Sequence, residues 1–210
     1  MANFEQLANG VIAGNEAQVK ELTKSFLDGG ADPLTLINQG LISGMSVVGA
    51  RFKNGEMYVP EVLMSARAMN AGLAIVKPLI ADSDLPSEGK VVLGTVKGDL
   101  HDIGKNLVGM LMESAGITVI NLGVDVAPEK FVAAVKEHKP DIIAMSALLT
   151  TTMLSMKDTI EVLKEEGLRD KVKVIVGGAP ISNDFAEEIG ADGFAPDAAS
   201  ATELCKQLIS

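Results

Sequence analysis

The sequence predicts two parts of different fold class: an N-terminal bundle of four helices, and then an α/β domain with a five-stranded parallel sheet. Apolar residues recur at helical spacing up to about residue 80. Beyond residue 89, short β-rich segments alternate with helical ones, the pattern of a parallel sheet covered by helices on both faces. We therefore expect one domain at residues 1–88 and a second at residues 89–210.

Local signals mark the ends of the predicted N-terminal helices. Gly29-Gly30 is expected to end the second helix, and Asp32-Pro33 is typical of an N-cap followed by Pro at the first helical position. Pro60 is expected to begin the fourth helix in the same way. The apolar positions are Leu7 and Val11; Val19, Leu22 and Phe26; Leu34, Ile37, Leu41 and Val48; and Val59, Val62, Leu63, Ala66, Leu73 and Val76.

The C-terminal part is predicted to contain five βα units. A polar stretch with a proline, residues 81–88, suits a linker before them. The expected strands are 91–96, 118–123, 142–148, 172–178 and 192–196, and the expected helices lie near 103–115, 128–138, 152–166, 183–189 and 198–209.

Composition excludes several classes of protein. With 47% hydrophobic residues and a mean hydropathy of +0.27, the 210-residue chain can bury a core, so disorder is excluded. A net charge of −10 and only 3% aromatic residues argue against nucleic-acid binding. No apolar run approaches 18 residues, and the N-terminus resembles no signal peptide. With Cys205 as the lone cysteine, we expect a cytoplasmic protein with no membrane partner.

Three unusual loops are expected to converge if the strands follow a flavodoxin-like, Rossmann-related order. Ligands of such sheets bind beyond the carboxyl ends of the strands, where the strand order reverses. The loops after the first, third and fourth strands would lie near that point, and they span residues 96–106, 146–153 and 177–180.

The first of these loops carries His101, one of two histidines, two residues after Asp99. In one interpretation Asp99 only caps the next helix and His101 is incidental. Gly98 and Gly104 favour a ligand site, because glycines allow the backbone to approach a bulky ligand closely. Neither G-x-G-x-x-G nor a Walker A motif is present, and His138, on a predicted surface helix, is too remote in the pattern to complete a zinc site.

The other two loops are less specific by themselves. Hydroxyl groups at Ser146, Thr150 and Thr152 follow the third strand, where such residues often cap a helix. Gly177 and Gly178 follow the fourth strand and could form an ordinary turn. Together with the first loop they describe a cleft with one imidazole, one carboxylate, hydroxyl donors and a bare backbone floor.

These motifs resemble the signature of cobalamin-binding domains. Asp99, His101 and Gly104 match D-x-H-x-x-G, Ser146 and Leu148 match the S-x-L that follows, and Gly177-Gly178 matches the closing G-G. The segment from Arg51 to Val62, with Ser65-Ala66-Arg67, is similar to the helical cap of the methionine synthase group. The resemblance covers nearly the whole chain.

The resemblance implies a set of site residues. His101 would be the lower axial ligand of cobalt in place of the cofactor's own base, with Asp99 holding its other nitrogen and Thr152 anchoring Asp99. The displaced nucleotide tail would thread into the sheet crevice, and Phe52 and Val59, with Met57 and Val62, would cover the upper face of the corrin. The implied cofactor-binding residues are Gly98, Asp99, Leu100, His101, Asp102, Ile103, Gly104, Ser146, Leu148, Thr150, Gly177, Gly178, Ala198, Phe52 and Val59.

The resemblance also implies a function, that of a methyl carrier without catalysis of its own. A corrinoid, with its methylated form as intermediate, would shuttle methyl groups between two partners. One is a methyltransferase specific for a donor such as a methylamine, methanol, a methoxylated aromatic or a betaine; the other delivers to tetrahydrofolate or a thiol. A reductive activation protein would be a further partner. Two alternatives remain: a cobalamin sensor, disfavoured by the net charge of −10, and the small subunit of an adenosylcobalamin mutase.

Overall fold

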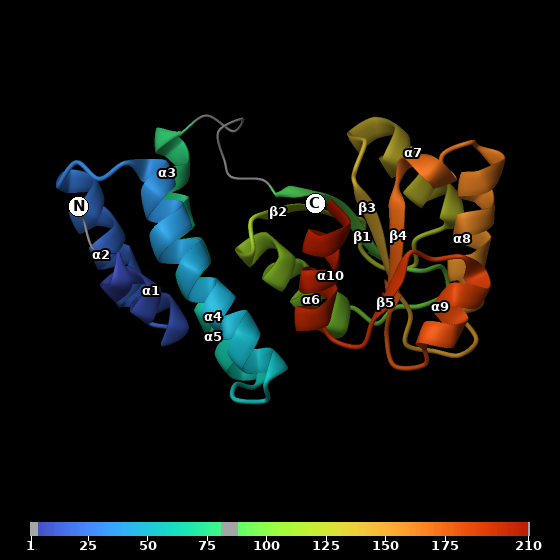
Figure 1. Cartoon of the computed structure of the whole chain (residues 1–210), viewed down its shortest axis with the longest axis horizontal. Helices are drawn as coiled ribbons and strands as arrows, with labels where there is room; N and C mark the ends of the chain where they lie inside the picture. The colour runs from blue at the N-terminus through green and yellow to red at the C-terminus, as the bar shows by residue number, and fades with distance from the viewer. Residues whose placement is uncertain (1–3, 81–87, 210) are drawn as a thin grey trace. The chain divides into compact units, whose positions relative to one another are not determined.

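The computed structural model describes residues 4–80 and 88–209 (Figure 1). The contacts divide the chain into two compact units, one of residues 1–87 with 114–116 and the other of residues 88–113 and 117–210. Except for Glu88, the predicted linker lies outside the described residues. The domain boundary between residues 88 and 89 stays a prediction.

The first unit contains the predicted four helical segments. Its second helix ends at Gly29, where Gly30 adopts a φ of 81°. The third begins after Asp32, whose carboxylate accepts a hydrogen bond from the Thr35 N–H at 2.8 Å. The elements are α1 (Glu5–Ile12), α2 (Glu16–Asp28), α3 (Pro33–Leu36), η1 (Ile37–Ile42), α4 (Ser43–Lys53), α5 (Val59–Val76) and η2 (Lys77–Leu79). None of the described helices combines the length and apolar character that a membrane span needs.

The third helix contains a π-helical segment, which the sequence analysis did not predict. The helix runs from α3 through η1 into α4. Its buried residues recur every fourth position, at Leu36, Gly40, Gly44 and Val48. An α-helix turns every 3.6 residues, so such a row drifts around it, and the wider π turn compensates for the drift. The π segment thus keeps the row on one buried face.

The fourth helix begins one residue earlier than predicted. Val59 is its first residue, so Pro60 occupies the second position rather than the first. The Glu61 carboxylate accepts a hydrogen bond from the backbone N–H of Tyr58 at 2.8 Å. The Glu61 side chain thus gives the Tyr58 N–H an acceptor, which favours a helix that begins at Val59.

The second unit is a five-stranded parallel sheet in the order β2-β1-β3-β4-β5, which confirms the predicted fold class. The strand order reverses between β1 and β3, because β2 lies on one side of β1 whereas β3, β4 and β5 follow on the other. The elements are β1 (Gly89–Thr95), α6 (Ile103–Ser114), β2 (Ile117–Asn121), α7 (Pro128–His138), β3 (Ile142–Ser146), α8 (Leu154–Glu165), η4 (Arg169–Lys171), β4 (Lys173–Gly177), α9 (Asn183–Ile189), β5 (Gly193–Ala195) and α10 (Ala198–Ile209).

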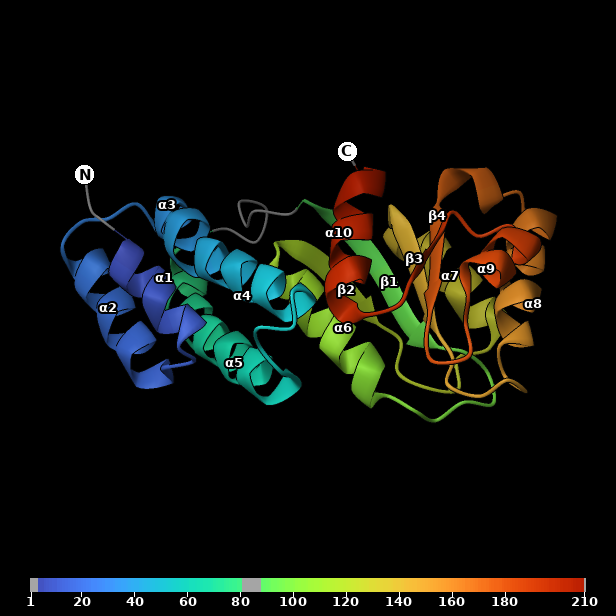
Figure 2. The ribbon, with the colours of Figure 1, turned by 60° about the horizontal axis from the view of Figure 1, so that its bottom comes forward.

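Two apolar layers enclose this sheet. On one face, α7, α8 and α9 pack through residues such as Phe131, Ile160 and Ile189. On the other, α6 and α10 pack through Met112 and Cys205 (Figure 2). Because strand residues alternate between faces, the odd-numbered positions of β1 face α6 and α10.

A row of small residues crosses the carboxyl end of the sheet on the α6 and α10 side. Thr95 is in register with Ser146, Ser146 with Gly177, and Gly177 with Ala195. The residues two positions earlier in β1 and β3, Leu93 and Ala144, belong to the core under the same helices. The sheet therefore lacks large side chains at the edge where ligands of such folds bind.

Gly94 and Phe131 form a tight contact on the opposite face, and it yields a stability prediction. A Cβ atom at Gly94 would lie 2.8 Å from the fully buried ring of Phe131. We expect Gly94→Ala to lower the free energy of unfolding by about 1–3 kcal/mol, because this ring cannot move away in a close-packed core. Urea unfolding of the single variants and of Gly94→Ala with Phe131→Leu tests this. The smaller side chain should relieve part of the cost, and strictly additive costs would contradict the steric explanation.

Candidate functional site

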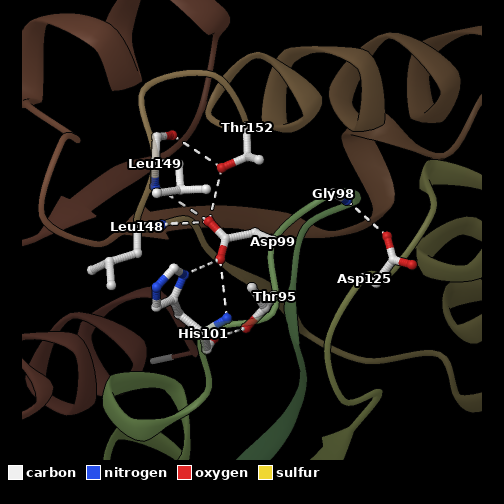
Figure 3. Close-up of polar contacts among 8 residues, drawn as sticks. All are labelled: Thr95, Gly98, Asp99, His101, Asp125, Leu148, Leu149 and Thr152. Atoms are coloured by element: carbon white, nitrogen blue, oxygen red, sulfur yellow. Dashed lines mark hydrogen bonds and ion pairs between the residues drawn. The ribbon is translucent and has the colours of Figure 1, made fainter.

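The site is organised around Asp99, a fully buried carboxylate in the loop between β1 and α6. Five hydrogen bonds end on it (Figure 3). Its Oδ1 accepts from the backbone N–H of His101 at 3.1 Å and from the ring Nδ1 of His101 at 2.7 Å. Its Oδ2 accepts from the N–H groups of Leu148 at 2.7 Å and Leu149 at 3.3 Å and from the Thr152 hydroxyl at 2.8 Å.

These donors keep Asp99 ionised. Burial alone would raise the pKa of Asp99, but the hydrogen bonds from Leu148, from the backbone and ring of His101 and from Thr152 outweigh burial and hold that pKa well below its usual range. The Thr152 Oγ1 also lies 3.0 Å from the Leu149 carbonyl, yet its single proton favours the charged acceptor. Asp99 is therefore a fixed negative charge.

The charge on Asp99 determines which nitrogen of His101 carries a proton. An ionised carboxylate only accepts hydrogen bonds, so Nδ1 must be the donor at 2.7 Å. In the neutral ring, Nε2 then holds the lone pair, and no hydrogen bond within residues 4–80 and 88–209 reaches it. The His101 side chain is 52% exposed while Asp99 is 0% exposed. The pair presents one outward, unprotonated imidazole nitrogen on a buried support.

Two further residues position this loop, and the sequence analysis missed both. Asp125, in the loop after β2, accepts a hydrogen bond from the Gly98 N–H at 2.7 Å, and its own N–H donates to the Asp99 carbonyl at 3.0 Å. Thr95, fully buried at the end of β1, donates from its hydroxyl to the His101 carbonyl at 2.8 Å. Asp125 adopts a φ of 52° and follows Gly123, a turn signal that marked this loop in the sequence.

A buried lysine lies one turn beyond His101. The Lys105 ammonium donates to the side-chain oxygens of Asn106 at 2.8 Å and Asn121 at 2.7 Å, which joins the start of α6 to the end of β2. Burial lowers the pKa of Lys105, opposed by the negative charge of Asp102. A cation in the first turn of a helix opposes the helix dipole, and this unfavourable placement was the available sequence signal.

The other predicted residues of the second unit lie at the carboxyl ends of the strands. Ser146 ends β3, Gly177 ends β4, and Ala198 is the buried first residue of α10, whereas Thr150 is exposed in the loop before α8 and donates none of the five hydrogen bonds to Asp99. Chain packing explains the glycine at 178. A Cβ atom there would come 1.9 Å from the Ala147 carbonyl oxygen, at a φ of 122°.

Apolar and open positions surround His101. Leu100 is 72% exposed, Ile103 83% and Leu148 44%, values far outside the usual range for large apolar side chains in a core. A Cβ atom at Gly104 would meet no atom within 4 Å, so the neighbouring chain does not require glycine there. Asp102 is exposed beside them. This arrangement leaves room for a bulky, partly apolar ligand next to the imidazole.

The predicted corrin-covering residues belong to the first unit. Val59 is 37% exposed and Phe52 is half-buried, whereas Val62 is buried on the same helix face as Ala66 and Met69. Met57 is buried as well. Of these four residues, Phe52 and Val59 have exposed side-chain surface that a ligand could contact.

The described residues do not form a closed metal site of their own. Among the described residues, no group of three His, Cys, Asp or Glu side chains could hold a metal ion. His138 lies at the end of α7 and Cys205 in the core under α10, where burial raises the pKa of its thiol to about 12. A single imidazole backed by a carboxylate suits the axial position of a macrocyclic metal cofactor.

Comparison with known families identifies the class of protein. Residues 89–204 match a family described as "B12 binding domain", and residues 4–77 match a second family of the same description. The fold, the site and these matches define a corrinoid-binding protein with a helical B12-binding domain before an α/β one. The chain belongs to the family of corrinoid proteins found in methyltransferase systems.

Relatives and solved structures support this assignment along the full chain. A corrinoid protein of Desulfitobacterium hafniense (strain Y51) is 49% identical, covering 100% of this chain and 98% of its own length. The dimethylamine corrinoid protein of Methanosarcina barkeri is 43% identical over 99% of this chain and 97% of its own. The methanol:cobalamin methyltransferase complex of Methanosarcina barkeri contains a chain with a TM-score of 0.89 and 34% identity, covering 98% of this chain and 79% of that one.

The charge on Asp99 predicts a pH dependence of stability. The unfolded chain binds a proton at Asp99 more readily than the folded protein, so its stabilising contribution is fully present above the ordinary aspartate pKa of about 4. That contribution is lost as pH falls through the lowered pKa of the folded protein. Urea unfolding between neutral and acid pH should show a shallower acid-side loss of stability in Asp99→Asn than in the wild type. Equal slopes would contradict the assigned charge.

Proposed function

We propose that this chain binds a corrinoid with the His101 Nε2 as lower axial ligand of cobalt, and that it carries a methyl group between two separate methyltransferases. The observation that carries the proposal is the hydrogen bond of 2.7 Å between Asp99 and the His101 Nδ1, which leaves the other ring nitrogen outward and unprotonated. The cofactor's own base would then be displaced, with its nucleotide tail in the second unit.

The residues present fit this cofactor. The bound corrinoid supplies a cobalt that takes a methyl group from one substrate and gives it to another, and its ring supplies the equatorial ligands that the chain lacks. His101 supplies the missing axial nitrogen. The row of Thr95, Ser146, Gly177 and Ala195 leaves the crevice without large side chains, as the nucleotide tail requires. The exposed Leu100, Ile103 and Leu148 offer apolar contact to the ring.

His101 would also provide a place for a proton, at Nε2, whenever that atom does not hold the cofactor. Its Nε2 then carries an unshared electron pair and can take a proton from solvent. The resulting imidazolium is stabilised by Asp99, whose carboxylate lies 2.7 Å away and stays ionised because of its donors. Thr152 and the Leu148 N–H hold that carboxylate in place. Protonation at Nε2 thus competes with coordination at the same atom.

The names of the relatives support small methylated compounds as donors. They include dimethylamine and trimethylamine corrinoid proteins of Methanosarcina barkeri and, among solved structures, its monomethylamine corrinoid protein, with a TM-score of 0.57 and 37% identity. A donor-specific methyltransferase would load the chain. A second methyltransferase would deliver to tetrahydrofolate or a thiol, a reductive activation protein would restore the reactive cobalt state, and the site of action would be the cytoplasm.

The ligand assignment predicts a spectral change in a histidine variant. His101→Ala should retain the corrinoid through its tail, and its visible spectrum should change to that of a cofactor without imidazole coordination. His138→Ala, which removes the chain's other histidine, is the matched control and should leave the spectrum as in the wild type. An unchanged spectrum in His101→Ala would refute the assignment.

The carrier role predicts transfer that depends on partners. The reconstituted chain, with a methyltransferase encoded beside it, should move an isotopically labelled methyl group from a methylamine or methanol to the cofactor and then to an added acceptor. Methoxylated aromatics and betaines complete the donor panel. A stable adenosyl group on the purified native cofactor, without transfer from any donor, would sink the proposal.

A further inference from the structure

Thr95 makes a contact with His101 that none of the motifs describes. It is the last residue of β1, fully buried, and its Oγ1 donates to the His101 carbonyl oxygen at 2.8 Å (Figure 3). Both polar groups of its own backbone are held by the segment after β2, since its N–H donates to the Gly123 carbonyl and its carbonyl accepts from the Val126 N–H, each at 3.0 Å. The hydroxyl therefore starts from a fixed point of the sheet.

A buried hydroxyl at this strand position needs a hydrogen-bond partner. Buried strand positions are usually occupied by residues such as Val, which has the shape of Thr without the polar atom. A buried hydroxyl stabilises the fold only when it is hydrogen-bonded. At residue 95 its acceptor is the main chain of His101, six residues further on.

The Thr95 contact restrains the main chain of His101 in a way that the two hydrogen bonds to Asp99 do not. Both hydrogen bonds from His101 to Asp99 end on the same oxygen, Oδ1. Two contacts on one atom leave the main chain of His101 able to swing about that atom, and such a movement would draw the ring away from Asp99. The loop has conformational freedom to do so, because Gly98, with a φ of 82°, and Gly104 flank it. The contact from Thr95, in β1, to the His101 carbonyl prevents this movement.

We propose that Thr95 is a positioning residue that aims the His101 Nε2 along one direction, so that the imidazole coordinates cobalt in a single geometry. The inference rests on the proposed function, because it takes His101 to be the axial ligand. Asp99 sets the protonated nitrogen of the ring, and Thr95 sets where the ring lies. The two roles act through different atoms of His101, and the ring stays against Asp99 only while Thr95 holds the main chain.

The first test uses the protein without cofactor. Thr95→Val removes the hydroxyl and keeps the shape, and Thr95→Ser restores a donor. Thr159→Val is the matched control, because Thr159 is equally buried and its hydroxyl donates to the Ser155 carbonyl at 2.8 Å rather than to His101 or Asp99. With ¹⁵N-labelled histidine only two rings are observed, and nitrogen shifts tell which atom carries the proton.

We expect one tautomer, protonated at Nδ1, for His101 in the wild type, Thr95→Ser and Thr159→Val. Thr95→Val should show averaged shifts, because the ring no longer stays against Asp99. Wild-type shifts in Thr95→Val would overturn the proposal. Should Thr95→Val fail to fold, Thr95→Cys takes its place, since a thiol is a weak donor, and it should move the shifts in the same direction.

The second test uses the chain loaded with Co(II) cobalamin. With ¹⁵N-labelled histidine, the electron paramagnetic resonance spectrum separates a protein nitrogen on cobalt from the cofactor's own ¹⁴N base. Thr95→Val should lower the ratio of His-bound to His-free cobalt roughly threefold to tenfold, the range expected for one lost hydrogen bond. Weaker coordination favours Co(I), so its midpoint potential should rise by up to about 59 mV, the equivalent of a tenfold change for one electron. Thr95→Ser should recover both values.

The two tests distinguish failure of this inference from failure of the proposed function. A wild-type spectrum without any protein nitrogen on cobalt would defeat the ligand assignment, while the cofactor-free shifts still decide whether Thr95 holds the ring. A wild-type spectrum with protein nitrogen, unchanged in Thr95→Val, would defeat the role of Thr95 alone. Equal effects of Thr95→Val and Thr159→Val would assign Thr95 to stability only.

Discussion

The site depends on one buried carboxylate that is fully satisfied by hydrogen bonds. An unpaired charge in the place of Asp99 would carry a large desolvation cost, so the fold must bring enough donors to it. They come from two separate segments, the loop after β1 and the loop after β3, which contribute His101 on one side and Leu148, Leu149 and Thr152 on the other. The carboxylate thereby ties together the two loops that meet where the strand order reverses.

The parallel sheet makes this meeting a consequence of its topology. In the order β2-β1-β3-β4-β5, β1 and β3 are neighbours, and their carboxyl ends lie at the same edge. Their following helices leave on different faces, α6 on one and α8 on the other, so the loops diverge at the edge where ligands of such sheets bind. The row of small residues from Thr95 to Ala195 lies at the same edge.

Sequence patterns predicted the elements well because their signals are local. Alternating β-rich and helical segments gave all five strands and their helices, and capping residues such as Asp32 placed helix ends. The π segment escaped prediction because it reflects a spacing of buried residues that only packing shows. The motif singled out Asp99, His101 and Thr152, which the structure brings together, whereas Thr150 donates no hydrogen bond to Asp99.

The contacts around Asp99 that sequence reasoning missed involve main-chain groups. Leu148, predicted only as a cofactor-binding residue, and Leu149 reach Asp99 with their N–H groups, which any residue but proline would provide, so their side chains carry no signal for this role. Thr95 resembled one more buried strand residue, and its hydroxyl is informative only once the His101 carbonyl is seen beside it. Asp125 clamps Gly98 from another βα unit, a contact that depends on strand order rather than on spacing.

The strength with which Asp99 is held decides where a proton on the pair would reside. If the carboxylate could take up the proton, Asp99 would become neutral and the imidazole would stay neutral. With its pKa held far below the usual range, Asp99 keeps its charge, so any proton that arrives must reside on the imidazole. Under the proposed function, Nε2 is the one atom of the pair that would hold either cobalt or a proton, and the direction of that nitrogen is then the quantity the fold has to control.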